Sequence, residues 1–356
     1  MPTKRHSIKD IARTLGVSPT TISFVLNGKG PEKKISAEMI ERVTAYAKKI
    51  NYKPNMLARS LRTGSTKILV FMVEDISNYF FSHVGRYIEE IAHERGYRVI
   101  FCSNENDDAR SRDLITLFLD RQVDGFILIP SSGIRDEVAS LVKSGVPVIL
   151  FDRYFPDLKT SYVVIDNYAA SLNATRHLIA GGYRHISFVT TDVEQVQMLD
   201  RSRGYTDAIT AAGLPVNILR VPFADTYSER AKDLIRTHFS TNDALDAVFF
   251  STNYLTQSGL EIIKEPGSKS ITELGILTFD DNDLFRINTP TISAVAQPMQ
   301  QLAEELMRIM LLLLLKQKGK TTTEPVQVTL PAELIVRGSS VGTRERIVEA
   351  STTGRL

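Results

Sequence analysis

Apolar residues recur with helical spacing along the first fifty residues of the chain. A serine stands before each of three such stretches, at Ser7, Ser18 and Ser36, where its side chain can cap a helix. The pattern predicts three short helices, the first ended by Gly16 and the second by Asn27-Gly28. Their apolar faces are Ile8, Ile11, Ala12 and Leu15, then Ile22, Val25 and Leu26, then Ile40, Val43, Ala47 and Ile50.

From Lys67 onward the pattern changes to short, almost continuous apolar runs separated by helical stretches. Such runs are typical of parallel strands that are buried on both faces. The remaining length is more than one such sheet normally uses, so an α/β body of two lobes is predicted. The runs are "KILVFMVE", "YRVIFCS", "DGFILIP", "VPVILFD", "SYVVID", "HISFVTT", "DAVFFST" and "LGILTFD".

The first two predicted helices are joined by a tight turn at Gly16, which is the arrangement of a helix-turn-helix. In that motif the N-terminal part of the second helix meets base edges in the major groove. We expect this helix to present Pro19, Thr20, Thr21, Ser23 and Phe24 away from the core. The threonines can bond bases or phosphates, and their methyl groups can touch a thymine methyl. Any two packed helices can give the same pattern, so the motif alone does not establish DNA binding.

Charge is distributed unevenly along the chain. Residues 1–66 hold 13 Lys and Arg against 4 Asp and Glu, whereas the rest of the chain holds 30 against 37. This basic head indicates contact with a polyanion, and the alternative is a solvated basic face. In the DNA-binding interpretation, Lys4, Arg5, Lys9 and Arg59 would contact phosphates.

The segment "NMLARSLRTGSTK" predicts a helix of about two turns from Asn55 to Arg62, which is marginal in water without packing partners. It would therefore be ordered only when docked on DNA or on a sister chain. Leu61 has two interpretations from its chemistry alone. It is either an ordinary linker leucine that packs on the body, or an apolar wedge between base steps in the minor groove.

Ligands of parallel sheets bind beyond the carboxyl ends of the strands. The predicted strands end in carboxylates and amides that suit a hydroxyl-bearing ligand such as a sugar or nucleoside, at Glu74-Asp75, Asp152-Arg153, Asp192, Asn253 and Asp280-Asp281. Each position precedes a helix, so helix capping is the alternative at each of them. Phe80 and Phe81 follow the first strand and could stack on a ligand ring or pack in the core.

Motifs of enzymes and metal sites are not found in the sequence. No G-x-G-x-x-G follows the first strand, and neither a P-loop nor G-x-S-x-G is present. The six histidines are scattered, so no catalytic residue, metal or cofactor is predicted. The lone Cys102 cannot form an internal disulfide, and no secretory signal is visible, which fits a reducing cytoplasm. The leucine run from Leu311 to Leu315 is too short to cross a membrane and predicts a buried helix.

The sequence resembles the lactose-repressor (LacI) family of bacterial transcription regulators over about residues 6–340. Several distinct motifs in the right order carry this resemblance, among them "SIKDIARTLGVSPTTISFVLNG", "INYKPNMLARSLRTGSTK", "DISNYFF", "VDGFILIPSS", "DRSRGYTDAI" and "TFDDNDLFRINTPTISAVAQP". It implies a homodimer that reads a pseudo-palindromic operator.

The resemblance also implies the architecture: an N-terminal helix-turn-helix three-helix domain, a hinge helix, and a periplasmic-binding-protein-like body of two doubly wound parallel-sheet lobes. The expected segments are the DNA-binding domain at 1–53, the hinge helix and linker at 54–66, the body at 67–340 and a polar tail at 341–356. Within the body, lobe 1 is expected at about 67–163 and 294–325, and lobe 2 at about 164–293 and 326–340.

Roles for individual residues follow from the same resemblance. Leu61, in "ARSLR", matches the hinge leucine that family members insert into the minor groove. The expected DNA-binding residues are Ser18, Thr20, Thr21, Phe24, Asn27, Asn55, Ala58, Arg59, Leu61 and Arg62. The expected effector-binding residues are Phe80, Phe81, Asp152, Arg201, Phe223, Asn253, Asp280 and Gln297.

Two positions depart from the family pattern. Phe24 stands where the family often has an arginine that can reach a guanine, so it either touches a thymine methyl or turns back to pack near the hinge. Tyr254 stands where an aspartate usually follows the asparagine, so the resemblance does not specify the ligand.

Together these features predict a sequence-specific DNA-binding regulator, expected to be a repressor, without enzymatic activity or a membrane partner. A small-molecule effector, a sugar or sugar derivative, would bind between the lobes and bias the hinge helices. Two alternatives come from other classes: a sugar-binding sensor protein without a DNA-binding role, and an enzyme of nucleotide-sugar or carbohydrate metabolism.

Overall fold

The computed structural model describes residues 6–52, 64–266, 274–317 and 324–341. The chain divides into two units, Met1–Thr66 and Lys67–Leu356, and each is described by itself. In the first unit the three predicted helices are confirmed as α1 (Ile8–Leu15), α2 (Pro19–Leu26) and α3 (Ala37–Lys49). They share a small core in which Ile11, Ile22 and Val43 are fully buried.

The helices of the first unit begin where the sequence predicts. The Ser7 hydroxyl accepts from the Asp10 amide at 3.2 Å, and the Asp10 carboxylate accepts from the Ser7 amide at 2.9 Å, which is a reciprocal capping box. The hydroxyls of Ser18 and Ser36 cap α2 and α3 by accepting from the amides of Thr21 and Met39, without the reciprocal bond. Gly16 ends α1 in the left-handed region at φ 70°, where a side chain would be strained. The prediction that Ser23 faces outward is wrong, since it is 8% exposed and packs on the core side of α2.

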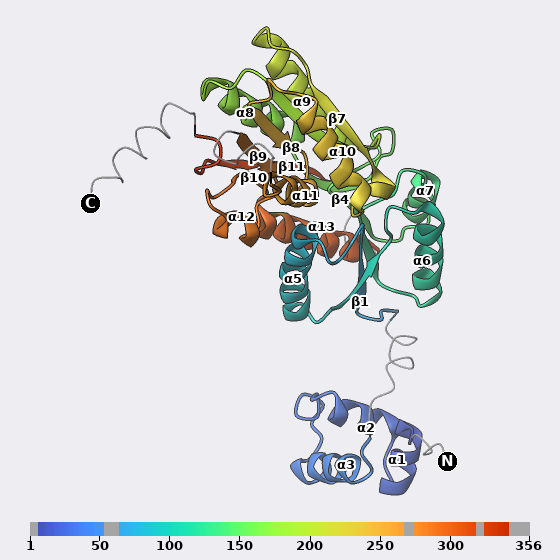
Figure 1. Cartoon of the computed structure of the whole chain (residues 1–356). Coiled ribbons are helices and arrows are strands. Elements are labelled where there is room, and N and C mark those ends of the chain that lie inside the picture. Colours follow the sequence, from blue (N-terminus) through green and yellow to red (C-terminus); the bar gives the residue numbers. More distant parts are fainter. Residues whose placement is uncertain (1–5, 53–63, 267–273, 318–323, 342–356) are drawn as a thin grey trace, which may run out of the picture. The chain divides into compact units, whose positions relative to one another are not determined.

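The second unit contains two six-stranded sheets (Figure 1). The first sheet is entirely parallel. Its order is β11 (Gln327–Leu330), β5 (Ser161–Ile165), β4 (Val148–Phe151), β3 (Gly125–Leu128), β1 (Ile68–Val73) and β2 (Arg98–Ser103). Its helices are α5 (Tyr79–Glu94), α6 (Asp108–Asp120), α7 (Arg135–Lys143) and α13 (Met299–Gln317).

The second sheet repeats this strand order. It runs β12 (Glu333–Ile335), β10 (Ser293–Ala296), β9 (Gly275–Phe279), β8 (Ala247–Phe250), β6 (Ile186–Asp192) and β7 (Ile218–Pro222). Among the described strands of this sheet, the short β12 alone pairs antiparallel, with β10. Its helices are α8 (Asn167–Ala180), α9 (Val196–Ala211), α10 (Glu229–Ser240), α11 (Asn253–Ile263) and the short α12 (Asp283–Ile287), with a 3₁₀ turn, η1 (Phe223–Asp225).

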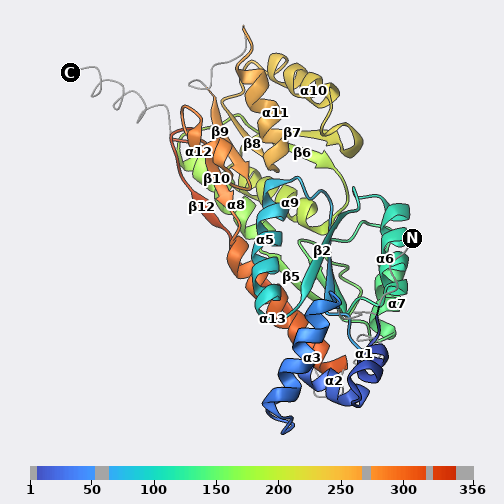
Figure 2. The same cartoon turned by 90° about the horizontal axis from the view of Figure 1, so that it is seen from below.

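Alternate residues of the strands pack on opposite faces, which is why both faces of each sheet need helices. In β1, Leu69 and Phe71 join the cluster that contains residues of α5 and α13, whereas Val70 and Met72 join residues of α6 and α7. Figures 1 and 2 show α5 beside α13, and the two helices pack on each other. All eight runs form strands, and seven of them are largely buried, as predicted. The prediction of a buried strand is wrong for β2, which lies at the edge of its sheet and has only exposed and half-buried residues.

The chain crosses between the lobes at slightly different points from those expected. β11 belongs to the first sheet and β10 to the second, so residues 327–330 are part of lobe 1 and residues 294–296 part of lobe 2. The lobes are therefore joined after β5, between β10 and α13, and between β11 and β12. The expected boundaries at 294 and 326 differ from these crossing points by a few residues.

The leucine run lies in helix α13, as predicted, but it is not fully buried. Leu314 is 4% exposed, whereas Leu315 is 41% exposed. Among the helices that the structure describes, none is both long enough and apolar enough to cross a membrane.

Candidate functional site

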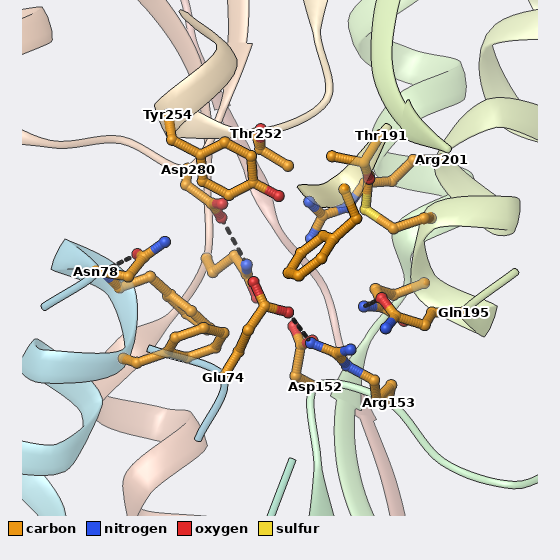
Figure 3. Close-up of a pocket in the computed structure, with 16 residues that line it drawn as sticks. Glu74, Asn78, Asp152, Arg153, Thr191, Gln195, Arg201, Thr252, Tyr254 and Asp280 are labelled. Carbon is orange, nitrogen blue, oxygen red and sulfur yellow. Dashed lines mark hydrogen bonds and ion pairs between the residues drawn. The ribbon is translucent and has the colours of Figure 1, made fainter. Parts of the chain in front are cut away.

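A pocket lies in the body at the carboxyl ends of strands from both sheets (Figure 3). Glu74 follows β1, Asp152-Arg153 follow β4, and Asp280 follows β9. In each sheet the strand order reverses beside the first strand of the lobe, which is where doubly wound sheets bind ligands. The free volume is about 40 Å³, which is room for a water molecule or so and far below the ~300 Å³ of small ligand sites. A sugar would therefore have to move the lobes or the lining side chains apart.

The structure brings the expected effector-binding residues together. Seven of the eight line the pocket: Phe80, Phe81, Asp152, Arg201, Phe223, Asp280 and Gln297. The eighth, Asn253, does not line the pocket. Its side-chain amide donates to Asn78, which is a lining residue. Their proximity does not test whether they contact an effector, so that role stays a prediction.

Helix capping does not explain the strand-ending residues. Other residues occupy the N-cap positions of the helices that follow the strands: Asn78 for α5, Thr252 for α11 and Asn282 for α12, each with a side-chain cap bond, and Gln195 for α9 without one. Asp75 is not a lining residue and instead accepts from the Ser77 amide at 2.8 Å. The carboxylates of Glu74, Asp152 and Asp280 therefore do not serve as caps.

Asp152 and Asp280 occupy equivalent positions in the two lobes. Each follows the fourth strand of its lobe, and each has a left-handed backbone, with φ 65° and 69°. This region costs an ordinary residue roughly 1 kcal/mol, and aspartate tolerates it better than most. The unusual turn directs both carboxylates into the space between the sheets (Figure 3).

Arg201 of α9 is held rigidly at the bottom of the pocket. It is 3% exposed, and its Nε donates to the Asn167 side-chain oxygen and its Nη1 to the Ser251 carbonyl, each at 2.8 Å. The guanidinium also lies 3.6 Å from the centre of the Phe279 ring, a cation–π distance. Its orientation is thus set by three groups of lobe 2.

Asp280 faces this arginine. Burial raises the pKa of the Asp280 carboxyl, while the charge of Arg201 and a hydrogen bond from Gln297 act in the opposite direction. The Gln297 amide donates to Asp280 Oδ1 at 2.6 Å. Arg201 and Gln297 offset only part of the cost of burying the Asp280 carboxylate, which therefore remains a strong hydrogen-bond acceptor. A hydroxyl group of a ligand can donate to such an acceptor.

Glu74 and Arg153 form a buried ion pair at the edge of lobe 1. Arg153 Nη2 lies 2.6 Å from Glu74 Oε2, and their side chains are 5% and 10% exposed. The sequence marked both as strand-ending residues but did not include them among the effector-binding residues. Their pairing could not be anticipated, because β3 lies between β1 and β4 and the two residues are 79 positions apart.

Seven further lining residues were not among the expected effector-binding residues: Asn78, Thr191, Gln195, Gln197, Met198, Thr252 and Tyr254. Tyr254 is the departure noted in the sequence, and its ring centre lies 5.2 Å from that of Tyr227. Burial raises the pKa of Tyr254 well above its ordinary value, and the charge of Glu74 acts in the same direction. Tyr254 therefore remains a neutral phenol that can donate a hydrogen bond.

Polar contacts bridge the two lobes beside the pocket. The Gln195 amide of lobe 2 donates to Asn106 Oδ1 of lobe 1 at 2.8 Å. Asn253 donates to Asn78 Oδ1 at 3.2 Å, and the Tyr79 hydroxyl lies 3.4 Å from Asp283. Each such bond is worth about 0.5–1.5 kcal/mol at most, so lobe closure is held by small energies that a ligand can outweigh.

In the first unit, the expected DNA-binding residues in and beside α2 differ in exposure and in whether their side chains already have partners within the protein. The Thr20 side chain is exposed, whereas Thr21 Oγ1 lies 2.8 Å from Ser18 Oγ. The Asn27 amide donates to the Ser23 carbonyl at 2.6 Å. Phe24 is half-buried, with the Lys33 ammonium 5.4 Å from its ring centre. The expected hinge residues Asn55, Ala58, Arg59, Leu61 and Arg62 lie outside the described residues.

Comparison with known proteins decides the family. Residues 65–334 match the model of periplasmic binding proteins and sugar binding domain of LacI family. Residues 7–55 match the model of bacterial regulatory proteins, lacI family. The chain belongs to the LacI family. It is accordingly a DNA-binding transcriptional regulator with the sugar-binding domain of that family, and the predicted fold class is confirmed.

Individual relatives cover almost the whole chain. Catabolite control protein A of Priestia megaterium is 29% identical over 335 residues, which is 94% of this chain and 99% of the relative. The structure of the transcriptional regulator CelR-cellobiose complex has a TM-score of 0.66 at 25% identity, and covers 94% of this chain and 100% of that one. The lac repressor dimer bound to operator and the anti-inducer ONPF has a TM-score of 0.78, over 95% and 100% of the two chains. Its 17% identity supports the fold alone.

Proposed function

We propose that this LacI-family protein is a homodimeric repressor that binds a pseudo-palindromic operator, and that a sugar or sugar derivative bound between its lobes controls operator affinity. The observation that carries the proposal is the gathering of seven expected effector-binding residues from both lobes around one pocket. The cellobiose complex of a structural relative supports a sugar as the ligand class. We expect the protein to act in the bacterial cytoplasm, because a gene regulator has to reach the chromosome.

The mechanism that we infer couples the pocket to the hinge. The pocket has room for little more than water, and the lobes are bridged by a few weak hydrogen bonds. Ligand binding therefore has to change the relation between the lobes, and a ligand shifts such an equilibrium by its difference in affinity for the two states. A changed lobe angle alters the spacing of the segments 54–66 in a dimer and thus the formation of their helices on DNA.

DNA recognition would be divided between two elements. In α2, Thr20 is the exposed hydroxyl at the start of the helix, where base edges are contacted. The Lys33 ammonium over the Phe24 ring favours a packing role for Phe24 over a hydrogen-bonding role. Sequence preference would then depend on Thr20, on its neighbours, and on the DNA deformation produced by Leu61.

Selection of bound fragments from the host's own genome tests this function. The expected result is a small set of fragments with a common inverted repeat, bound by a dimer, with an affinity that falls steeply as salt rises. Candidate sugars suggested by the neighbouring genes are then titrated into the operator complex, and one of them should change the operator affinity. Enrichment of no common sequence would contradict the proposal.

One measurement tests the phosphate contacts expected of the basic head. Filter binding to random duplex DNA at low and moderate salt should show salt-dependent retention if the basic head binds phosphates. Absence of retention at low salt would contradict these phosphate contacts. We expect no enzymatic turnover of any sugar that binds.

A further inference from the structure

The pocket is unusual in the balance of its charged groups. Three carboxylates line it, from Glu74, Asp152 and Asp280, and among the described lining residues only two guanidinium groups face them, from Arg153 and Arg201. Figure 3 shows Glu74, Asp152 and Asp280 directed toward the same space. A ligand therefore enters surroundings with more negative than positive charge.

The positive charge of Arg153 is also already engaged. Each of its three nitrogens has an acceptor in the protein: Nη2 binds Glu74 Oε2 at 2.6 Å, Nη1 binds Asn106 Oδ1 at 3.0 Å, and Nε lies 3.4 Å from Asp152 Oδ2. In Arg201, Nε and Nη1 are bound by groups of lobe 2. Capture of a phosphate by an arginine uses a fork of free N–H groups, and Arg153 does not offer one.

The pocket contains, by contrast, hydrogen-bond acceptors that are available to a ligand. Among the described residues, the hydrogen bonds and ion pairs of the three carboxylates use one oxygen each, namely Glu74 Oε2, Asp152 Oδ2 and Asp280 Oδ1. Gln197 lines the pocket, is 4% exposed, and its Oε1 is buried without a partner. A ligand that displaces solvent from these carboxylate oxygens has to supply hydrogen-bond donors itself, and Gln197 Oε1 adds a buried acceptor beside them.

We propose, building on the proposed function, that the cleft selects an uncharged polyhydroxylated ligand and rejects its phosphate esters and sugar acids, and that Glu74 sets this selection by occupying Arg153. Hydroxyl groups donate to carboxylates, whereas a phosphate monoester carries a charge of about −1.5 to −2 and offers mainly acceptors. Placed among these carboxylates, the anion is repelled in a partly buried site, and we expect its affinity to be at least about 100-fold below that of the neutral sugar.

Isothermal titration calorimetry on the full chain with matched pairs of probes tests the selection. The pairs are glucose and glucose 6-phosphate, ribose and ribose 5-phosphate, fructose and fructose 1-phosphate, and cellobiose and cellobionic acid. The expected result is that at least one neutral member binds and that its anionic partner binds at least about 100-fold more weakly. An anionic member that binds as tightly as its neutral partner, or a panel in which no neutral member binds, overturns the proposal.

Glu74→Gln tests the role assigned to that residue. The variant keeps an oxygen that can accept from Arg153 but removes the charge, so the anionic partner should gain affinity and the ratio within the pair should shrink at least about tenfold. Asp75→Asn is the control, because it removes a charge from the neighbouring residue, which does not line the pocket. Its ratio should match that of the wild type.

An unchanged ratio in folded Glu74→Gln would reject the role of Glu74, with folding checked by thermal unfolding. Should that variant not fold, the wild-type panel still decides the selection itself. Failure of the proposed function has a separate signature, since it appears as the lack of an operator in the genomic selection and does not depend on which sugars bind.

Discussion

Gly204 of α9 packs against the backbone of α8, and replacing it with alanine tests how the position of Arg201 is maintained. A Cβ atom at Gly204 would overlap the carbonyl oxygen of Tyr168 and lie 2.9 Å from the Leu172 nitrogen. Backbone atoms cannot rotate away as a side-chain tip can. Ordinary non-bonded contacts are at about 3.5 Å, so the two helices would have to separate by roughly 1 Å.

The expected magnitude follows from two opposing effects. Inserting a methyl group into a tight contact costs about 1–3 kcal/mol, whereas alanine is favoured over glycine within a helix by about 0.8–1.0 kcal/mol. Gly204→Ala should therefore lower the free energy of unfolding by up to about 2 kcal/mol. Arg201 lies one turn earlier on α9, and its carbonyl accepts from Ser171 Oγ of α8 at 2.6 Å. Since errors of about 1 Å in position are costly, we expect effector affinity to fall at least about tenfold.

Urea unfolding and calorimetric titration of the sugar identified in the panel measure the two effects. The matched control is Gly181→Ala at the end of α8, where the backbone has φ −70° and an added Cβ would lie 3.4 Å from the Leu178 carbonyl. This variant should be stabilised by about 0.4–1 kcal/mol, because alanine restricts the unfolded chain. If Gly204→Ala proved as stable as the wild type and bound the effector equally well, the contact between α8 and α9 would not position Arg201.

Four further predictions concern single residues. Asp280→Asn should raise the unfolding temperature at pH 7, because burial raises the pKa of Asp280 and the folded state bears an unfavourable charge. The stability that Asp280 contributes is fully present below its unfolded pKa and is lost as pH rises through the folded pKa, so unfolding curves in acid should bring variant and wild type together. Arg201→Ala should abolish the effector response in operator titrations while the separate core of the head stays folded. Leu61→Ala should weaken operator binding far more than binding to random DNA, and equal losses would reject the wedge role. Ser18→Ala removes the α2 cap and should destabilise the head by about 0.5–2 kcal/mol in thermal unfolding, unless solvent replaces the cap.

The elements that the sequence predicted are those with a strong local signal. β1, β3 and β4 consist of buried apolar residues that pack on helices on both sides, so their composition alone identifies them. β7, β11 and β12 were missed because they carry little hydrophobic signal, and β10 was missed because its largely buried run is only the four residues Ser293–Ala296. β11 alternates exposed and half-buried residues at the edge of its sheet, and β12 has three residues, so tertiary pairing rather than composition makes them strands.

The candidate site was predictable to the extent that it follows a rule about strand ends. Asp152 and Asp280 were found because each stands directly after an apolar run. Gln195 and Gln197 stand at the start of α9 and have no such marker. Their place in the pocket depends on the position of α9, which is set by its packing on α8 and not by adjacent residues. Contacts between distant segments, such as the ion pair of Glu74 with Arg153, cannot be predicted from the hydrophobic pattern of neighbouring residues.

The first sheet has a consequence for how the chain folds during synthesis. It starts with β1 at residue 68 and is completed by β11 at residues 327–330, which pairs with β5. A ribosome has therefore translated nearly the entire chain before the sheet of lobe 1 can be completed. Until then the edge of β5 is open, and unpaired edges invite association with other chains. A truncation before residue 327 should yield aggregates rather than a smaller regulator.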